Sequence, residues 1–214
     1  MGNHGRTPDL AIELGQDRGE ESLLELEILA RKRILTSVRR LRRRPLIDVD
    51  APAGPGAYLL WRQPITRTDG FYDRLYRPFE LGRPLYVGKV SPSTGLDSRL
   101  AVHTRSIDQA AGLDTADFFC ATLSTRTGAF ASYVEAVLLE EFGKALPLNG
   151  SGFGARDPGR KRKGQKPSLF DALHEGRRWA SNDLDQGARA LAALRIAQSG
   201  AMPPPPSLVW GPIV

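Results

Sequence analysis

Apolar residues recur along the chain with two spacings, which predict helices in some segments and strands in others. From Glu20 to Arg44, leucines, isoleucines and a valine recur at helical spacing among charged residues. This pattern predicts a long helix that Pro45 ends. Residues 1–20 are polar and contain glycine, so we expect them to be poorly ordered.

Three short apolar runs bounded by turn residues predict β-strands. They are Ala57–Trp61, Pro84–Val90 and Asp117–Leu123, and the first follows a loop of chain breakers over Asp50–Gly56. The polar and aromatic stretch Arg62–Arg83 separates the first two strands. A hairpin connection of this length indicates a functional segment or local structure.

Two helices are predicted around the third strand. Asp97 is placed to cap a helix over Ser98–Ala111, and a second helix is expected over Ala129–Gly143. The apolar face of that second helix comprises Phe130, Tyr133, Val134, Val137 and Leu138. The order β-β-α-β-α predicts an α+β fold, with a small three-stranded, mainly antiparallel sheet flanked by helices and helical extensions at both ends.

The chain becomes glycine-rich and basic past Asn149. Ser168 and Asp171 have the spacing of a capping box that opens a short helix. Alanines and leucines over Asp183–Gln198 predict another helix, which the proline run Pro203–Pro206 stops.

The charge pattern is compatible with a polyanionic partner. The net charge is +6, from 30 Lys and Arg against 24 Asp and Glu, and cations gather in the clusters Arg31–Arg44 and Arg156–Lys166. Such clusters are equally compatible with a solvated surface and with contacts to nucleic-acid phosphates.

Composition excludes several other classes of protein. No apolar run reaches the roughly 18 residues of a membrane span, and the N-terminus lacks the apolar stretch of a signal peptide. The single cysteine, Cys120, can form neither an intrachain disulfide nor a thiolate zinc cluster. We therefore expect a cytoplasmic protein with no membrane partner.

Two tyrosines stand at comparable positions in neighbouring predicted strands. Tyr58 ends the segment Gly-Ala-Tyr, and Tyr86 opens the segment Tyr-Val-Gly, which Lys89 follows. On the next predicted helix, Arg99 and His103 share one face because they are four residues apart. Each residue alone would suit a rim or surface position; together they form a candidate site.

Glu135 differs from the other glutamates of its predicted helix. Glu140 has Lys144 four residues later as a surface partner, whereas Glu135 has Ala131 and Leu138 as neighbours. It therefore stands at the edge of the apolar face, where an unpaired carboxylate is costly. This makes it the best candidate metal ligand of the helix.

The order of these elements resembles the motifs of the GIY-YIG nuclease superfamily. The match comprises the two tyrosine segments with Lys89, Arg99-x-x-x-His103, the helix with Glu135, and Asn149 in a Pro-Leu-Asn-Gly turn. Ala57 stands where the motif usually has isoleucine.

The surrounding segments narrow the resemblance. The long insert between the tyrosines and the downstream segments 152–159, 166–171 and 174–177 are similar to Eco29kI-type restriction endonucleases. The resemblance covers roughly Gly54 to Ala180.

The resemblance implies seven catalytic residues. They are Tyr58, Tyr86, Lys89, Arg99, His103, Glu135 and Asn149. Tyr58 is the candidate general base, with Lys89, Arg99 and a cation stabilising its phenolate. His103 would bind phosphate or compete with Tyr58 as the base, and these two assignments stay open.

The remaining roles concern the phosphate and the metal. Tyr86 would bond water or the scissile phosphate, Arg99 would hold that phosphate, and Asn149 would orient it or its neighbouring groups. Glu135 would hold one Mg²⁺ in each active site, since a two-metal site needs more carboxylates than this constellation has.

The resemblance predicts an Mg²⁺-dependent type II restriction endonuclease of a prokaryotic cytoplasm. It would act as a homodimer on a short, GC-rich palindrome in double-stranded DNA, with a methyltransferase encoded nearby. The DNA-binding candidates are Arg156, Arg160, Arg162, Lys163, Gln165 and Lys166. The alternatives are a repair or homing nuclease and a DNA-binding protein without turnover.

The predicted organisation has three parts. Residues 1–50 form an extension with a basic helix, and residues 51–155 form the catalytic core with its long insert. Residues 156–214 hold the basic DNA-contacting segment, further helices and the proline-rich tail.

Overall fold

The computed structural model describes residues 10–66, 70–79, 82–142, 146–154, 167–177 and 186–201. The chain divides into two compact units, Met1–Ser37 and Val38–Val214. Helix α1 (Leu10–Arg39) accounts for the described part of the first unit, and the sheet belongs to the second.

Both predicted ends of the first helix were wrong. Helix α1 begins at Leu10, within the segment expected to be poorly ordered. It ends at Arg39, ahead of Pro45. The residues next to the proline are instead recruited into a strand.

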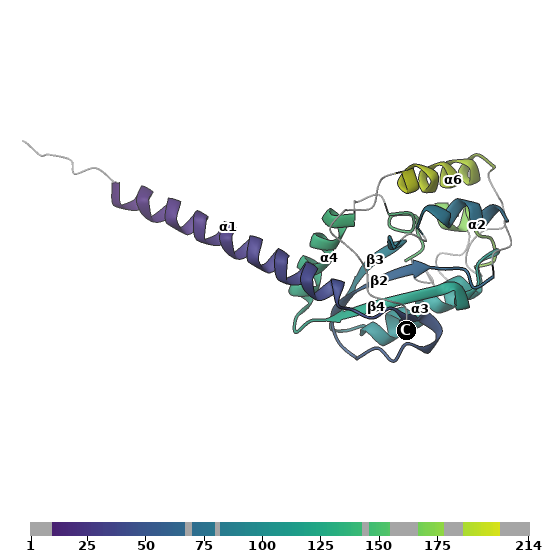
Figure 1. The fold of residues 1–214 in the computed structure, drawn as a ribbon, viewed down its shortest axis with the longest axis horizontal. Helices are drawn as coiled ribbons and strands as arrows, with labels where there is room; N and C mark the ends of the chain where they lie inside the picture. The colour runs from purple at the N-terminus through teal and green to yellow at the C-terminus, as the bar shows by residue number, and fades with distance from the viewer. Residues whose placement is uncertain are drawn as a thin grey trace, which may run out of the picture. The chain divides into compact units, whose positions relative to one another are not determined.

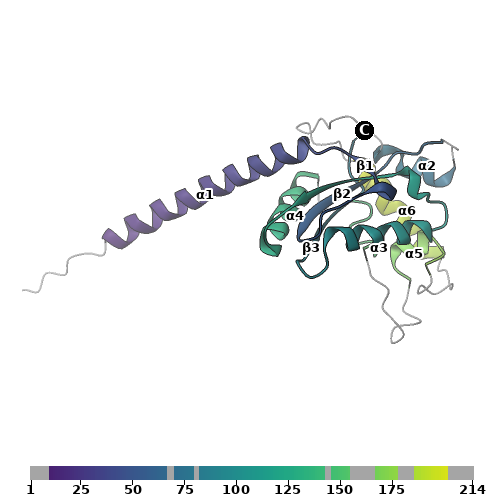
Figure 2. The same ribbon diagram turned by 90° about the horizontal axis from the view of Figure 1, so that it is seen from below.

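A four-stranded sheet in the order β1-β4-β2-β3 forms the centre of the second unit, and all neighbours are antiparallel. The strands are β1 (Arg44–Pro45), β2 (Gly56–Arg62), β3 (Tyr86–Val90) and β4 (Phe118–Ser124). The α+β prediction is confirmed. The sheet has one strand more than predicted, because β1 is two residues long and no strand pattern reveals it. Figure 1 shows β3, β2 and β4 side by side in the order of the register, and Figure 2 shows β2 beside β3 from below.

One helix follows each of the second and third predicted strands in the chain. Helix α3 is Leu96–Asp108, and Asp97 does not cap it: Gly95, at φ 76°, precedes the helix, so Asp97 falls in the first turn. Helix α4 is Gly128–Phe142. Its buried residues are Ala131, Val134, Val137, Leu138 and Phe142. Phe130, predicted on that face, is exposed because it lies at the edge of the face in the first turn.

Helices α3 and α4 cover opposite faces of the β2–β3 pair. Tyr58 lies opposite Gly88 in the register, so it points to the other face from Lys89. Tyr58 bonds His103 on α3, whereas Lys89 pairs with Glu135 on α4. The two halves of the candidate site therefore lie on opposite faces of the β2–β3 pair.

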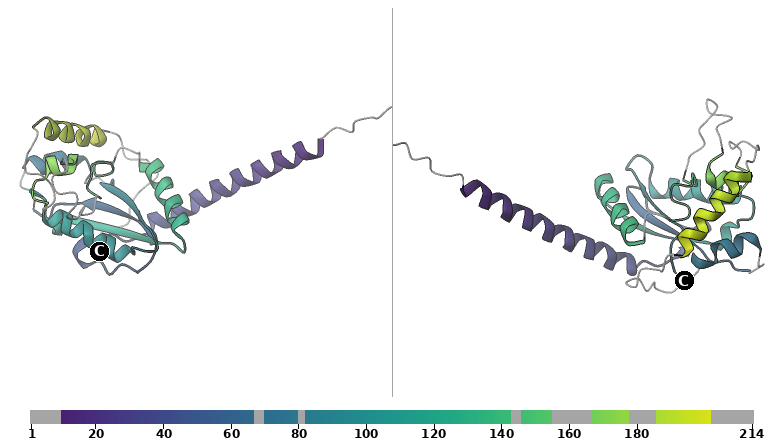
Figure 3. Two further views of the ribbon diagram at one scale, coloured as in Figure 1. Left: turned by 180° about the vertical axis from the view of Figure 1, so that it is seen from behind. Right: turned by 90° about the horizontal axis from the view of Figure 1, so that it is seen from above.

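The long insert and the C-terminal region pack together. The insert holds helix α2 (Phe71–Tyr76) and a 3₁₀ turn over Arg77–Phe79, which confirms that this connection carries local structure. Helix α6 (Gln186–Ala201) lies beside α2 and packs on α5 (Leu169–Leu173), as Figures 1 and 3 show.

The predicted capping box is confirmed at the start of α5. The Ser168 hydroxyl accepts from the backbone of Asp171, whose carboxylate accepts from the backbone of Ser168. The predicted proline tail lies outside the described residues. None of the helices in the described part of the chain is long and apolar enough to cross a membrane.

Candidate functional site

The Tyr58 hydroxyl is the centre of a buried hydrogen-bonded group. Strand β2 places the ring under α3, where the tyrosine is fully buried. Its oxygen is 2.6 Å from Nε2 of His103, and Nε of Arg99 donates to the same oxygen over 3.2 Å. Arg99 and His103 reach one hydroxyl because they are one helical turn apart, as their spacing predicts.

Burial determines the resting protonation of this group. Desolvation raises the pKa of Tyr58, the neighbouring Tyr86 adds to that rise, and Arg99 opposes it. Desolvation also lowers the pKa of His103, and the charges of Arg99 and Arg177 lower it further. At neutral pH the pair is therefore a neutral phenol and a neutral imidazole.

Tyr86 lies on the same face of the sheet as Tyr58, with ring centroids 5.9 Å apart. Gly88 makes this approach possible, since a Cβ there would lie 2.6 Å from atoms of both tyrosines. The glycine of the Tyr-Val-Gly segment is therefore required by packing under the two rings.

The segment Gly152–Gly154 lies over this group, and sequence reasoning assigned no role to it. The Gly154 carbonyl accepts from Nη2 of Arg99 over 2.6 Å. Phe153 stacks on His103, with centroids 4.6 Å apart and planes inclined by 13°. A Cβ on Gly154 would lie 2.6 Å from the Tyr86 hydroxyl, so only glycine fits without displacement.

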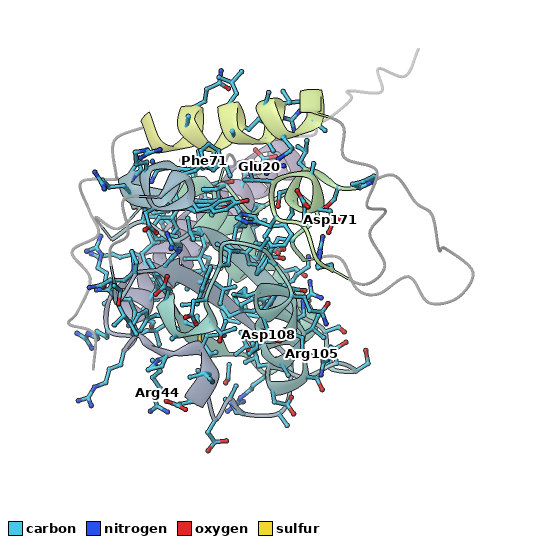
Figure 4. The ribbon with its side chains drawn as sticks, turned by 90° about the vertical axis from the view of Figure 1, so that its right-hand side faces the viewer. Glu20, Arg44, Phe71, Arg105, Asp108 and Asp171 are labelled. Carbon is cyan, nitrogen blue, oxygen red and sulfur yellow. The ribbon has the colours of Figure 1, made fainter. Side chains whose placement is uncertain are left out.

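Arg177 holds the segment Gly152–Gly154 in place. Its guanidinium is almost fully buried and donates to the carbonyls of Gly152 and Phe153 and to the Asp171 carboxylate. Asp171 is labelled in Figure 4 at the start of α5. The His174-Glu-Gly-Arg177 motif was the sequence signal for this residue, but nothing in it indicated the contact.

Lys89 and Glu135 form the second half of the site. Nζ of Lys89 lies 3.2 Å from Oε2 of Glu135, whose side chain is 22% exposed. The structure therefore brings Arg99 rather than Lys89 to the Tyr58 hydroxyl. Within the described ranges no three His, Cys, Asp or Glu residues converge to hold a metal ion.

Asn149 closes the free edge of β3. Its Oδ1 accepts from the Val87 N–H over 2.9 Å, and its Nδ2 donates to the Val87 carbonyl over 2.7 Å. The side chain thus supplies both bonds that a neighbouring strand would give to this residue. It secures the strand that carries Tyr86 and Lys89.

The predicted DNA-binding residues lie outside the described part of the chain. These are Arg156, Arg160, Arg162, Lys163, Gln165 and Lys166.

A second tyrosine–histidine pair joins the insert to the C-terminal region. The hydroxyl of Tyr76, on α2, is 2.7 Å from Nε2 of His174, and Nδ1 of that histidine is 2.9 Å from the Ala111 carbonyl. Arg62 lies beside it and donates to Asp73 and Asp117. Sequence reasoning did not find this network, whose members come from four separate segments.

Comparison of the chain with known proteins gives a family match. The family model described as the Eco29kI GIY-YIG domain matches residues 52–197, which is more than half of the chain. A search among curated proteins gave no match.

Proposed function

The chain belongs to the Eco29kI-type GIY-YIG nucleases, and on this premise we propose that it is an Mg²⁺-dependent restriction endonuclease. Its substrate would be double-stranded DNA carrying a short, GC-rich palindromic site. The observation that carries the catalytic proposal is the Tyr58 hydroxyl, held between an Arg99 donor and a His103 acceptor.

We propose that Tyr58 and His103 act in series, so that neither is the base alone. As a water oxygen attacks phosphorus, its proton passes to the Tyr58 oxygen while the Tyr58 proton passes to Nε2 of His103. The bond from phosphorus to the 3′ oxygen breaks on the opposite side. This route avoids a resting phenolate, which burial disfavours by raising the pKa of Tyr58.

Arg99 and Tyr86 are assigned to the phosphate. Arg99 keeps N–H groups beyond those given to Tyr58 and Gly154, and a guanidinium is suited to phosphate oxygens. The Tyr86 ring is only partly buried and lies beside the Tyr58 ring, so we assign its hydroxyl to a bond with the phosphate or the attacking water. Asn149 acts through Val87 as a positioning residue.

Glu135 is assigned to the metal. Mg²⁺ in phosphoryl-transfer sites keeps several waters and takes one or two carboxylates plus substrate oxygens, which fits a single partly exposed glutamate. When bound, the cation would neutralise charge on the departing 3′ oxygen. Lys89 neutralises the Glu135 carboxylate in the free protein, and we propose that it turns to the phosphate in the complex.

We assign recognition of the DNA bases to the segment that contains Arg156, Arg160, Arg162, Lys163, Gln165 and Lys166. Arginine and lysine can bond guanine O6 and N7, and glutamine can read adenine. A palindromic site is most simply read by a homodimer. A neighbouring methyltransferase gene and a place in a prokaryotic cytoplasm complete this proposal.

Incubation of the protein with plasmid DNA and Mg²⁺ tests the proposal directly. We expect discrete fragments whose mapped ends share one palindrome, and no cleavage after chelation. Structure-dependent nicks would instead indicate a repair enzyme, and a gel shift without products would indicate binding alone.

Replacement of Glu135 tests the metal assignment. Glu135→Ala should abolish cleavage and leave DNA affinity in a gel-shift assay largely unchanged. Glu140→Ala, on the same helix, serves as the matched control and should cleave normally. Retained cleavage by Glu135→Ala would refute the metal assignment.

A further inference from the structure

Helix α3 and its C-terminal cap hold three buried polar side-chain atoms that have no hydrogen-bond partner among the described residues. They are Nδ1 of His103, Oγ of Ser106 and Oε1 of Gln109. His103 and Ser106 are completely buried. Buried polar atoms are paired in the great majority of cases, because an unpaired one loses its bonds to water without compensation. Three such atoms on one helix therefore need a physical explanation.

The three residues form a row along one side of α3. They follow one another at intervals of three positions, and residues three positions apart are neighbours on a helix surface. Helical side chains also lean toward the N-terminus of their helix. Gln109 therefore leans toward Ser106, and Ser106 leans toward His103. The row begins at the imidazole of the candidate site and runs away from it.

Glu175 and Gly176 pack against the Gln109 end of this row. The N–H of Ala111 donates to the Glu175 carbonyl over 2.7 Å. A Cβ on Gly176 would collide with the backbone carbonyl oxygen of Gln109, so the two backbones are in close contact. The row therefore lies in the interior of the protein, where bulk water does not supply the missing bonds.

The three unpaired atoms have complementary hydrogen-bonding capacity. In the proposed cleavage reaction Nε2 of His103 receives the Tyr58 proton, so the neutral imidazole carries its own proton on Nδ1 and donates there. The Ser106 hydroxyl both accepts and donates, and the amide oxygen of Gln109 only accepts. The row thus runs from a donor, through a group that does both, to an acceptor. This is the order that a hydrogen-bonded chain requires.

We propose that buried water joins Ser106 and Gln109 to Nδ1 of His103, and that this row positions the imidazole for proton transfer. Water is needed because no direct bond joins the three atoms to one another. A buried water typically makes about three hydrogen bonds to polar groups that would otherwise be unpaired. Ser106 and Gln109 are positioning residues, since they act through His103. The proposal rests on the proposed cleavage reaction, in which His103 is the final proton acceptor.

The electrostatics of His103 give this row a purpose. Burial lowers the pKa of His103, and the charges of Arg99 and Arg177 lower it further. The imidazolium that forms when the Tyr58 proton arrives is therefore disfavoured unless acceptors stabilise it. A chain of acceptors at Nδ1 fixes the required tautomer before the transfer and stabilises the charge after it.

The imidazole ¹⁵N shifts of His103 test the row without any assay of activity. In the full-length protein without DNA or Mg²⁺, they should show one neutral tautomer with its proton on Nδ1. Ser106→Ala should give a mixture of the two neutral tautomers, because it removes the nearest acceptor of the row. Gln109→Met, which removes the last acceptor at similar side-chain length, should give a smaller change in the same direction. Thr104→Val is the matched control and should match the wild type, because the Thr104 hydroxyl bonds the Leu100 carbonyl of the same helix.

The cleavage rate supplies the second test. Ser106→Ala should reduce the maximal rate about tenfold or more, by analogy with partners that orient metal-binding histidines, and should leave DNA affinity unchanged. Gln109→Met should reduce it less. The double variant should be no slower than Ser106→Ala, because two residues that act in series do not contribute additively.

Three results would each overturn the proposal. They are a proton on Nε2 in the wild type, an unchanged tautomer or rate in Ser106→Ala, and additive losses of rate in the double variant. A wild type that does not cleave DNA would refute the nuclease proposal, and the tautomer of His103 in the variants would still decide whether the row exists. Failure of the two proposals is therefore distinguishable.

Discussion

The two buried tyrosine–histidine pairs of this protein are alike in their central bond and in their burial, and differ in the groups that contact the hydroxyl and the imidazole. The hydroxyl-to-Nε2 distances are 2.6 Å for Tyr58–His103 and 2.7 Å for Tyr76–His174. In both pairs, burial raises the pKa of the phenol and lowers that of the imidazole. Both pairs are therefore neutral at rest.

The two pairs differ in the other contacts of the tyrosine hydroxyl and of the histidine ring. The hydroxyl of Tyr58 also accepts from Arg99, whereas Arg62 lies 5.8 Å from the ring centre of Tyr76. Nδ1 of His174 bonds a backbone carbonyl, which ties α5 to the end of α3. The second pair thus joins segments of the fold, and the first is the pair to which we assign proton transfer. A tyrosine–histidine bond alone does not identify a catalytic site.

Removal of the tyrosine hydroxyl from each pair should give the largest difference between the two pairs. Tyr58→Phe should reduce the cleavage rate about a thousandfold, the middle of the range for general acid–base catalysis. Tyr76→Phe should cleave at close to the wild-type rate. Both should lower the free energy of unfolding by about 1–3 kcal/mol, because each leaves a buried Nε2 without its donor. Rates and denaturant unfolding of the two variants measure this, and equal loss of cleavage in both would remove the distinction.

Removal of His103 should reveal the order of proton transfer. In His103→Ala the Tyr58 proton loses its acceptor, so cleavage should fall about a hundredfold at neutral pH. Residual activity should rise with pH, because the phenolate fraction increases at every pH below the pKa of Tyr58. Burial raises this pKa, so the rise should continue through the alkaline range. A rate that stays flat with pH would mean that His103, and not Tyr58, takes the proton from water.

The last expected effect concerns stability in acid and leaves the cleavage rate aside. The pKa of His174 is lowered by burial to about 4 in the folded protein, from an ordinary value of 6.5. The unfolded chain therefore binds more protons between these values, and stability is lost as pH falls through that window. The loss amounts to about 3 kcal/mol near pH 4.

His174→Gln isolates this contribution. The variant should be less stable than the wild type at pH 7, and its free energy of unfolding should fall less between pH 6.5 and pH 4. Urea unfolding across that range measures both slopes. Parallel slopes would show that His174 does not titrate on unfolding.

Local sequence patterns predicted most of the helices and strands and part of the candidate site. The helical interval between Arg99 and His103 predicted their common face, and the structure brings both to Tyr58. The strand β1 was missed because two residues carry no periodicity. Helix α1 was predicted too short at its start, because residues 1–20 were judged by their polar and glycine-containing composition.

Local sequence patterns did not predict the contacts between distant segments. The Gly154 carbonyl reaches Arg99 across 55 residues, and Asn149 bonds Val87 across 62. Lys89 pairs with Glu135 because strand alternation turns it away from Tyr58. Residue type alone cannot distinguish these partners, since each polar group has several compatible ones in the chain.

The sequence by itself determined the α+β class and the order of most helices and strands, because propensity and spacing are local properties, and the resemblance to a known family supplied the candidate site residues. Only the tertiary structure decided which of two tyrosine–histidine pairs carries an arginine donor and which is tied to a backbone carbonyl. Burial and the neighbours that folding brings to each hydroxyl set this difference, and those neighbours come from separate segments.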